Sequence, residues 1–180
     1  MKTVIADKIA SVAQNKGLKR ELRVSADIPC EEGVLVAVEI LNAKSTYNKL
    51  ELISGRMAQL KPGDVIVGAL GHRKALFGYS GHLPESLAPG DEIQVLNIGG
   101  VLGICDSINA NFGQPFNAKV LGAVLEFPIL GERIGVPARA GGEPLDDDPA
   151  LNTHGVPVVA LAGTCMDSGK TAAASASVAR

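Results

Sequence analysis

The sequence predicts a mainly β N-terminal domain, built as a barrel or a sandwich, followed by the first strand and helix of an α/β nucleotide-binding domain. Three observations carry this prediction: short β-branched segments from Arg20 onward, a turn sequence that occurs twice, and a glycine-bounded loop at 163–171. A length of 180 residues accommodates one ordinary domain together with part of another. We therefore expect a β-rich domain over 18–127 and only the start of a P-loop domain over 156–180.

Composition and charge narrow the classes of function. Apolar residues make up 46% of the chain, enough for a buried core, and the formal net charge is −2. This charge provides no broad basic surface, so nucleic acid is an unexpected partner. No apolar run approaches the ~18 to 20 residues of a membrane span, so no membrane partner is expected. Cys30, Cys105 and Cys165 lack paired spacing, which predicts reduced thiols in a cytoplasmic protein and leaves the oligomeric state open.

Residues 1–17 are expected to form a short amphipathic helix. Ile5, Ile9 and Val12 recur at helical spacing, and Gly17 follows as a C-terminal stop. After this segment the pattern changes to strands.

Four segments have the length and composition of β-strands. They are rich in β-branched and apolar residues and are separated by turn formers; they span 22–26, 34–41, 49–53 and 119–127.

A seven-residue pattern occurs twice in the predicted β domain. Residues 60–66 read Leu-Lys-Pro-Gly-Asp-Val-Ile, and residues 87–93 read Leu-Ala-Pro-Gly-Asp-Glu-Ile. Pro presets φ for the first central position of a turn, and Gly accepts the positive φ of a type II turn at the second. Each copy precedes a strand, a turn at Gly71 or Gly99-Gly100, and another strand, which predicts antiparallel β architecture. The pattern resembles turn entries of many small β-barrels, including the second domains of translation factors.

Residues 128–155 are expected to be a linker. Gly and Pro are frequent here, and Asp146, Asp147 and Asp148 form a charged run. The domain boundary is therefore placed in this stretch.

The loop at 163–171 carries the predicted chemistry. It reads Gly-Thr-Cys-Met-Asp-Ser-Gly-Lys-Thr, after an apolar run at 158–162 typical of a buried parallel strand and before an Ala-rich stretch that favours helix. Backbone N–H groups at a helix start bind phosphate oxygens, the lysine reaches the β- and γ-phosphates, and the Thr171 hydroxyl ligates Mg²⁺. The predicted nucleotide ligands are Gly163, Thr164, Ser168, Gly169, Lys170 and Thr171.

This loop resembles that of dethiobiotin synthetase and related ATP-dependent ligases of the P-loop NTPase superfamily. Its match covers Gly163, Thr164, Gly169, Lys170 and Thr171, with five residues rather than the common four before the Gly-Lys pair. Residues 167–171 are also similar to loops of the polynucleotide 5′-kinase family, some of which place a β domain ahead of the P-loop domain but use the shorter spacing.

The resemblance implies binding of ATP or GTP with Mg²⁺. A ligase or synthetase would activate an unknown acceptor by phosphoryl transfer, whereas a kinase would modify a polynucleotide or small hydroxyl substrate. A third hypothesis is a β-domain binding or scaffold module. A P-loop enzyme also needs an acidic residue after a second buried strand, so we expect this chain alone to be inactive.

Other polar residues have weaker claims. His72 is expected at an exposed hairpin tip, and His154 precedes the loop strand. His82 lies within Ser80–Glu85, whose Ser, His and Glu are too close in sequence for a catalytic triad. Asp106 ends an apolar run, where starting the next turn is favoured over a magnesium role.

Overall fold

The computed structural model describes residues 1–75, 78–129, 131, 133–141, 153–163 and 168–178. The chain divides into two compact units, Met1–Gly142 and Glu143–Arg180. The structure is mostly β, with 38% of residues in strands and 9% in helix, and its main feature is a large mixed sheet. The expectation of a mainly β first domain is confirmed.

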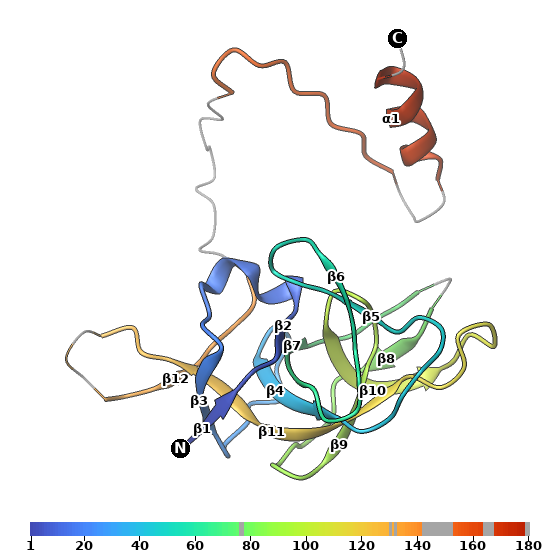
Figure 1. The fold of residues 1–180 in the computed structure, drawn as a ribbon. Coiled ribbons are helices and arrows are strands. Elements are labelled where there is room, and N and C mark those ends of the chain that lie inside the picture. Colours follow the sequence, from blue (N-terminus) through green and yellow to red (C-terminus); the bar gives the residue numbers. More distant parts are fainter. Residues whose placement is uncertain (76–77, 130, 132, 142–152, 164–167, 179–180) are drawn as a thin grey trace. The chain divides into compact units, whose positions relative to one another are not determined.

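Five strands of the first unit pair in a closed ring, called the strand ring below (Figure 1). The order around the ring is β4, β7, β10, β9, β11 and back to β4. This closure corresponds to the barrel alternative rather than the sandwich. The strands are β4 (Leu35–Ile40), β7 (Val65–Leu70), β9 (Glu92–Val95), β10 (Val101–Ser107) and β11 (Phe116–Glu126).

One junction of the strand ring differs from the expected antiparallel order. β7 and β10 are parallel, and β8 (Ser80–His82), which was expected to turn back along β7, pairs with β10 instead. The N–H of Gly71 donates to the carbonyl of Leu102 at 3.0 Å, so the end of β7 is bonded to β10. Gly71 therefore does not close a tight hairpin.

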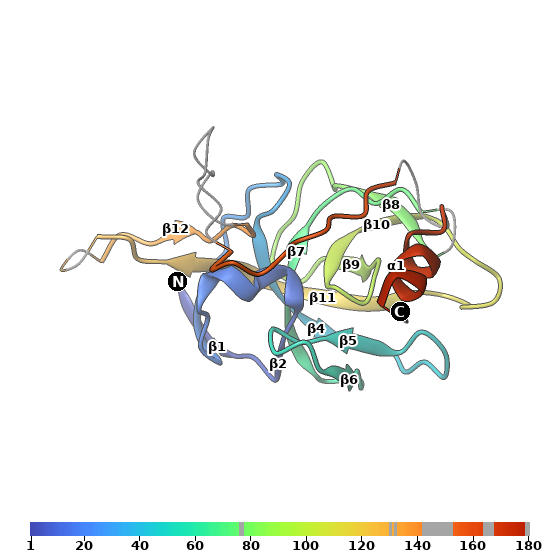
Figure 2. The same ribbon diagram turned by 90° about the horizontal axis from the view of Figure 1, so that it is seen from above.

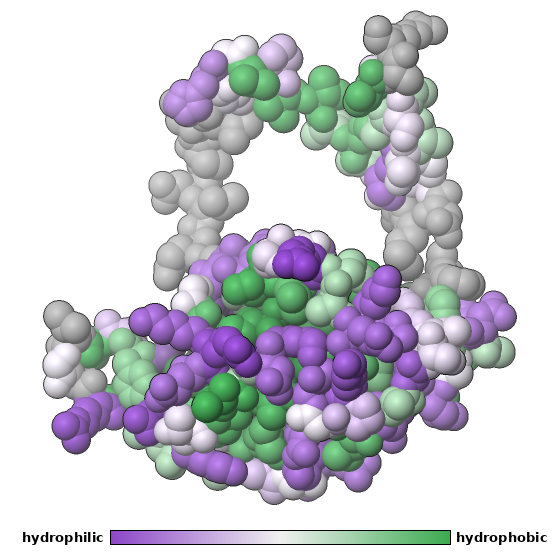
Figure 3. Space-filling model, in the orientation of Figure 1, coloured by the Kyte–Doolittle hydropathy of each residue, from purple (hydrophilic) through white to green (hydrophobic). Residues whose placement is uncertain are grey.

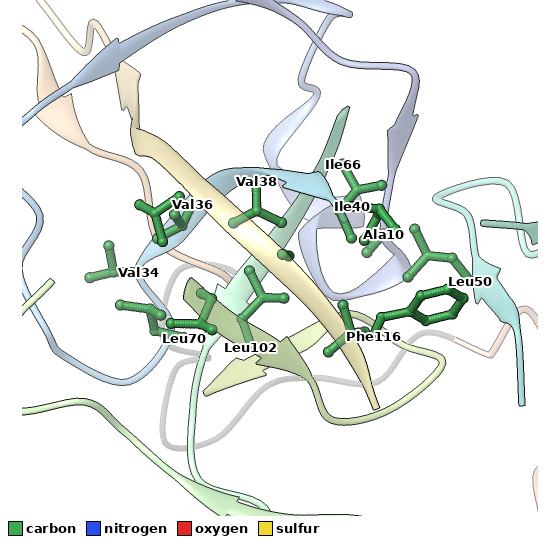
Figure 4. Close-up of a cluster of buried hydrophobic side chains, with 14 of the residues drawn as sticks. Ala10, Val34, Val36, Val38, Ile40, Leu50, Ile66, Leu70, Leu102 and Phe116 are labelled. Atoms are coloured by element: carbon green, nitrogen blue, oxygen red, sulfur yellow. The ribbon is translucent and has the colours of Figure 1, made fainter. Parts of the chain in front are cut away.

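The central strands are buried on both faces. Along β4, Val36 and Val38 face the cluster inside the strand ring (Figure 4), whereas Leu35 and Ala37 belong to a second cluster outside it. Strand β7 alternates in the same way. Because neither face meets water, both strands read as continuous apolar runs rather than as alternating ones.

The N-terminal segment covers the outer cluster as extended chain, and the helix expected over 1–17 is wrong for its first half. The structure has β1 (Lys2–Ile5), β2 (Lys8–Ile9) and a 3₁₀ helix η1 (Ser11–Lys16). β1 pairs with β3 (Glu21–Ser25), and β2 pairs with β7, so hydrogen bonds to the sheet override the helical spacing. Gly17 ends η1 with φ at 58°, as the stop signal predicts.

Both Pro-Gly-Asp turns form as predicted. Gly63 and Gly90 have φ of 86° and 102°, and the N–H of Asp64 and of Asp91 each closes its turn at 3.1 Å. Each aspartate side chain also accepts a backbone N–H, from Lys61 at 2.6 Å and from Ala88 at 2.8 Å. The turns are bonded to equivalent neighbours: Gly63 donates to Ile40 in β4, and Gly90 donates to Val120 in β11. The sequence repeat is therefore also a structural repeat.

The first unit extends into the expected linker. β12 (Val136–Pro137) pairs with the end of β11, and the two form an arm that projects from the strand ring in Figures 1 and 2. Ala138 is fully buried, and its carbonyl accepts the N–H of Leu35 at 2.8 Å. The sheet thus takes up residues that composition alone assigned to a loop. The aspartates at 146–148 lie outside the described residues.

A small separate sheet completes the first unit. β5 (Lys49–Glu51) and β6 (Met57–Gln59) form an antiparallel hairpin, with the buried Leu50 packed against the inner cluster.

The second unit contains the predicted helix but not the predicted strand. Helix α1 spans Lys170–Val178, whereas residues 156–163 are irregular and Val159 is 85% exposed. A parallel strand requires hydrogen-bonded neighbours and cover on both faces. The described part of this unit has no other strand to provide them. Among the described residues, no helix combines the length and apolar character needed to cross a membrane.

Candidate functional site

Most of the predicted phosphate loop lies within the described residues. Gly163, Ser168, Gly169, Lys170 and Thr171 are placed by the structure. Thr164 lies outside the described residues, together with Cys165, so its predicted contact stays a prediction.

The two ends of the loop approach each other. A Cβ atom added at Gly163 would lie 2.4 Å from Ser168 Oγ and 3.0 Å from Lys170 Cδ. The Lys170 side chain therefore folds back over Gly163, and its Nζ donates a hydrogen bond to Ser168 Oγ at 3.0 Å. Gly169 has φ at 83°, a left-handed conformation that favours glycine, at the point where the loop enters α1.

The start of α1 presents backbone donors beside this lysine. The N–H of Ala173 donates to the carbonyl of Gly169 at 3.0 Å, so the N–H groups of Thr171 and Ala172 precede the first intrahelical bond. Such groups, with the helix dipole, attract anions. The Thr171 residue is exposed at the same helix start. The described residues of this unit include no Asp or Glu, so a second magnesium ligand does not come from them.

A second polar pair lies in the first unit. His82 Nδ1 and Asp106 Oδ1 are 2.6 Å apart, and each side chain is 49% exposed. A bulge in β10 between Cys105 and Ser107 brings Asp106 to the histidine on β8. The carboxylate contacts Nδ1 and so orients the imidazole ring, an arrangement suited to proton transfer through the other ring nitrogen.

No sequence pattern links His82 with Asp106. They are 24 positions apart, and only the pairing of β8 with β10 joins them. Asp106 does not start the next turn as expected, because that turn begins at Asn109, whose side chain accepts the N–H of Asn111 at 2.9 Å.

A third polar cluster was not predicted. Lys44 Nζ donates to the hydroxyl of Tyr79 at 2.8 Å and to the carbonyl of Phe112 at 2.9 Å. Tyr47 stacks on Phe112 with ring centroids 4.6 Å apart. Burial lowers the pKa of Lys44 and, with smaller effects from Cys105 and Tyr47, raises the pKa of Tyr79 to about 12. The polar atoms of this cluster are hydrogen-bonded to one another. These bonds join the loops at 41–48 and 108–115 to each other and to Tyr79.

The structure also places the other two histidines. His72 is exposed just after β7. The next residue, Arg73, forms an isolated antiparallel bridge with Gly81. His72 therefore precedes this bridge and does not lie at the tip of a hairpin, where it was expected. His154 has φ at 50° in the second unit, and a contact with a nucleotide base remains a prediction.

Comparison of the chain with protein-family models, curated proteins and solved structures found no significant match.

Proposed function

We propose that residues 163–171 form a phosphate-binding loop for Mg·ATP or Mg·GTP, and that the chain is the N-terminal part of an ATP-dependent ligase or synthetase. The observation that supports this most is the position of Lys170. Its side chain lies back across Gly163 at the start of α1, so a cation and exposed backbone donors occupy one small region. The Gly-Thr start of the loop favours a ligase or synthetase over a kinase.

Each residue has a specific role in this proposal. Gly163 and Gly169 let the backbone approach the phosphates, and Lys170 binds the β- and γ-phosphates. Ser168 contributes its hydroxyl, and Thr171 ligates Mg²⁺ through its Oγ1. The bound nucleotide with its metal would supply an electrophilic phosphoryl group. In this proposal the loop and the start of α1 bind and orient that group, and their described residues include no acidic magnesium partner.

We expect Lys170→Ala to abolish nucleotide binding, because the ammonium is the main positive charge at the loop. The measurement is calorimetric titration of Mg·ATP and of Mg·GTP into the longest natural form of the protein. Lys19→Ala, which removes an exposed lysine of the first unit, is the matched control and should bind like the wild type. Equal affinity of the Lys170→Ala and wild-type proteins would contradict the proposal.

Product assays separate the alternative functions. A synthetase releases ADP and phosphate only when its acceptor is present, and it shows no salt-sensitive binding to RNA. A polynucleotide kinase labels 5′ ends of nucleic acid and binds them. A scaffold shows neither activity, and Lys170→Ala leaves its partner binding unchanged.

A further inference from the structure

We infer that the first unit carries a binding site for a small organic anion with an apolar tail, in a pocket between β1, β3 and β11. The pocket has a volume of about 450 Å³, within the range of sites for small molecules. We call it the β1–β11 pocket. All of its lining residues belong to the first unit, and the inference does not depend on the function proposed for the phosphate loop.

The walls of the β1–β11 pocket are mostly apolar and lie largely on three strands and one tight turn. The residues of these walls include Val24 of β3 and Leu121 at the bulge of β11. Gly90 of the second Pro-Gly-Asp turn also lines the pocket. The turn is bonded to the strand by the Gly90 N–H, which donates to the Val120 carbonyl at 2.9 Å. In Figure 3, apolar surface bordered by hydrophilic surface is visible where β1 and β11 lie in Figure 1. A site on strands and a tight turn is positioned more precisely than a site on loops.

The charge at the pocket is positive. Lys2 and Lys119 line it, and none of the lining residues is Asp or Glu. Lys119 is balanced by Glu39, since Lys119 Nζ lies 2.7 Å from Glu39 Oε2. The Lys2 side chain has no hydrogen bond or ion pair to any described residue, and the register of β1 places its backbone opposite Val24. Lys2 is thus the lining lysine whose charge no carboxylate of the described residues balances.

This combination selects a ligand with two parts. An apolar chain of several carbons would cover Val24 and Leu121, and a carboxylate at its end would meet the ammonium of Lys2. A neutral analogue of the same chain gains only the apolar contact, and acetate gains only the charge contact. Hexanoate, hexanol and acetate are therefore suitable probes.

The test is titration of each probe into the full chain, followed by the backbone amide signals in two-dimensional ¹H–¹⁵N NMR spectra. We expect hexanoate to shift the amides of Ser25, Ala26, Gly90 and Leu121 with one saturation curve. Lys2→Gln should weaken hexanoate binding about fivefold, the effect of one exposed ion pair, and leave hexanol unchanged. Lys49→Gln, which removes an exposed lysine of β5, is the matched control and should have no effect.

A second variant tests the cavity itself. Ala26 is exposed at the pocket, so Ala26→Phe fills the space without disturbing the core and should abolish the response to both hexanoate and hexanol. The inference is overturned if hexanoate produces no saturable shifts at these amides. It is also overturned if Lys2→Gln and Lys49→Gln weaken binding equally, because the charge effect would then be nonspecific.

Discussion

Gly100 illustrates how a single residue position limits what the strand ring accepts. The chain turns there between β9 and β10 with φ at 93°, and an added Cβ would lie 2.2 Å from the Cβ of Ala10. Gly113 has a positive φ of 63° as well, but nothing lies within 4 Å of an added Cβ. The two glycines therefore separate backbone strain from steric overlap.

We expect Gly100→Ala to destabilise the protein more than Gly113→Ala does. Gly113→Ala should lower the free energy of unfolding by about 1–2 kcal/mol, the strain of a left-handed alanine. Gly100→Ala adds an overlap with Ala10 and should lower it by roughly 3 kcal/mol or more. Urea unfolding followed by circular dichroism measures both values. Equal losses would mean that Ala10 moves away without cost.

Contacts between single residues also explain why the candidate sites were only partly predictable from sequence. The residue types of the proposed phosphate loop form a local pattern, so Gly163 and Lys170 could be proposed as ligands from sequence alone. The contact of His82 with Asp106 could not, because it depends on a bulge in β10 and on the pairing of β8.

At the scale of elements, the two Pro-Gly-Asp turns are matched units with one difference. Asp64 and Asp91 each accept a backbone N–H within the turn. Asp64 Oδ2 also lies 2.6 Å from Lys8 Nζ, and both side chains are mostly buried, with exposures of 16% and 17%. The first turn is therefore also bonded to β2.

We expect Asp64→Ala to cost more stability than Asp91→Ala. Loss of the turn hydrogen bond should cost about 1 kcal/mol at either position. Asp64→Ala also leaves the partly buried Lys8 unpaired, which should raise the loss to roughly 2–3 kcal/mol. Urea unfolding midpoints test the difference. Asp91→Asn, which keeps a side-chain acceptor, is the control and should stay close to wild type.

At the scale of the whole molecule, the two units differ in how much they bury. The buried apolar residues of the described chain run from Val4 to Ala138, all within the first unit. None of the described residues of the second unit is buried, including every residue of α1.

This distribution predicts that the first unit folds by itself. A chain ending after residue 142 should unfold in urea at the same midpoint as the full chain, because the core clusters are complete without the second unit. A midpoint clearly below that of the full chain would show that the second unit stabilises the first.

The sequence by itself determined the features whose signals are local. Both Pro-Gly-Asp turns, the stop at Gly17, the apolar strands of the ring and helix α1 follow from backbone preferences within a few residues. These preferences act before any distant contact forms, and the fold agrees with them.

Tertiary structure alone decided the features that depend on distant partners. The segment 1–9 is extended because β3 and β7 supply its hydrogen bonds. β7 pairs in parallel with β10, and the Gly71 N–H donates a backbone hydrogen bond to Leu102 of that strand. β12 forms because β11 is long enough to pair with it. Conversely, the apolar run at 158–162 lacks a neighbouring strand among the described residues and stays irregular. A strand is stable only when another segment satisfies its backbone groups, and sequence spacing does not state which segment that is.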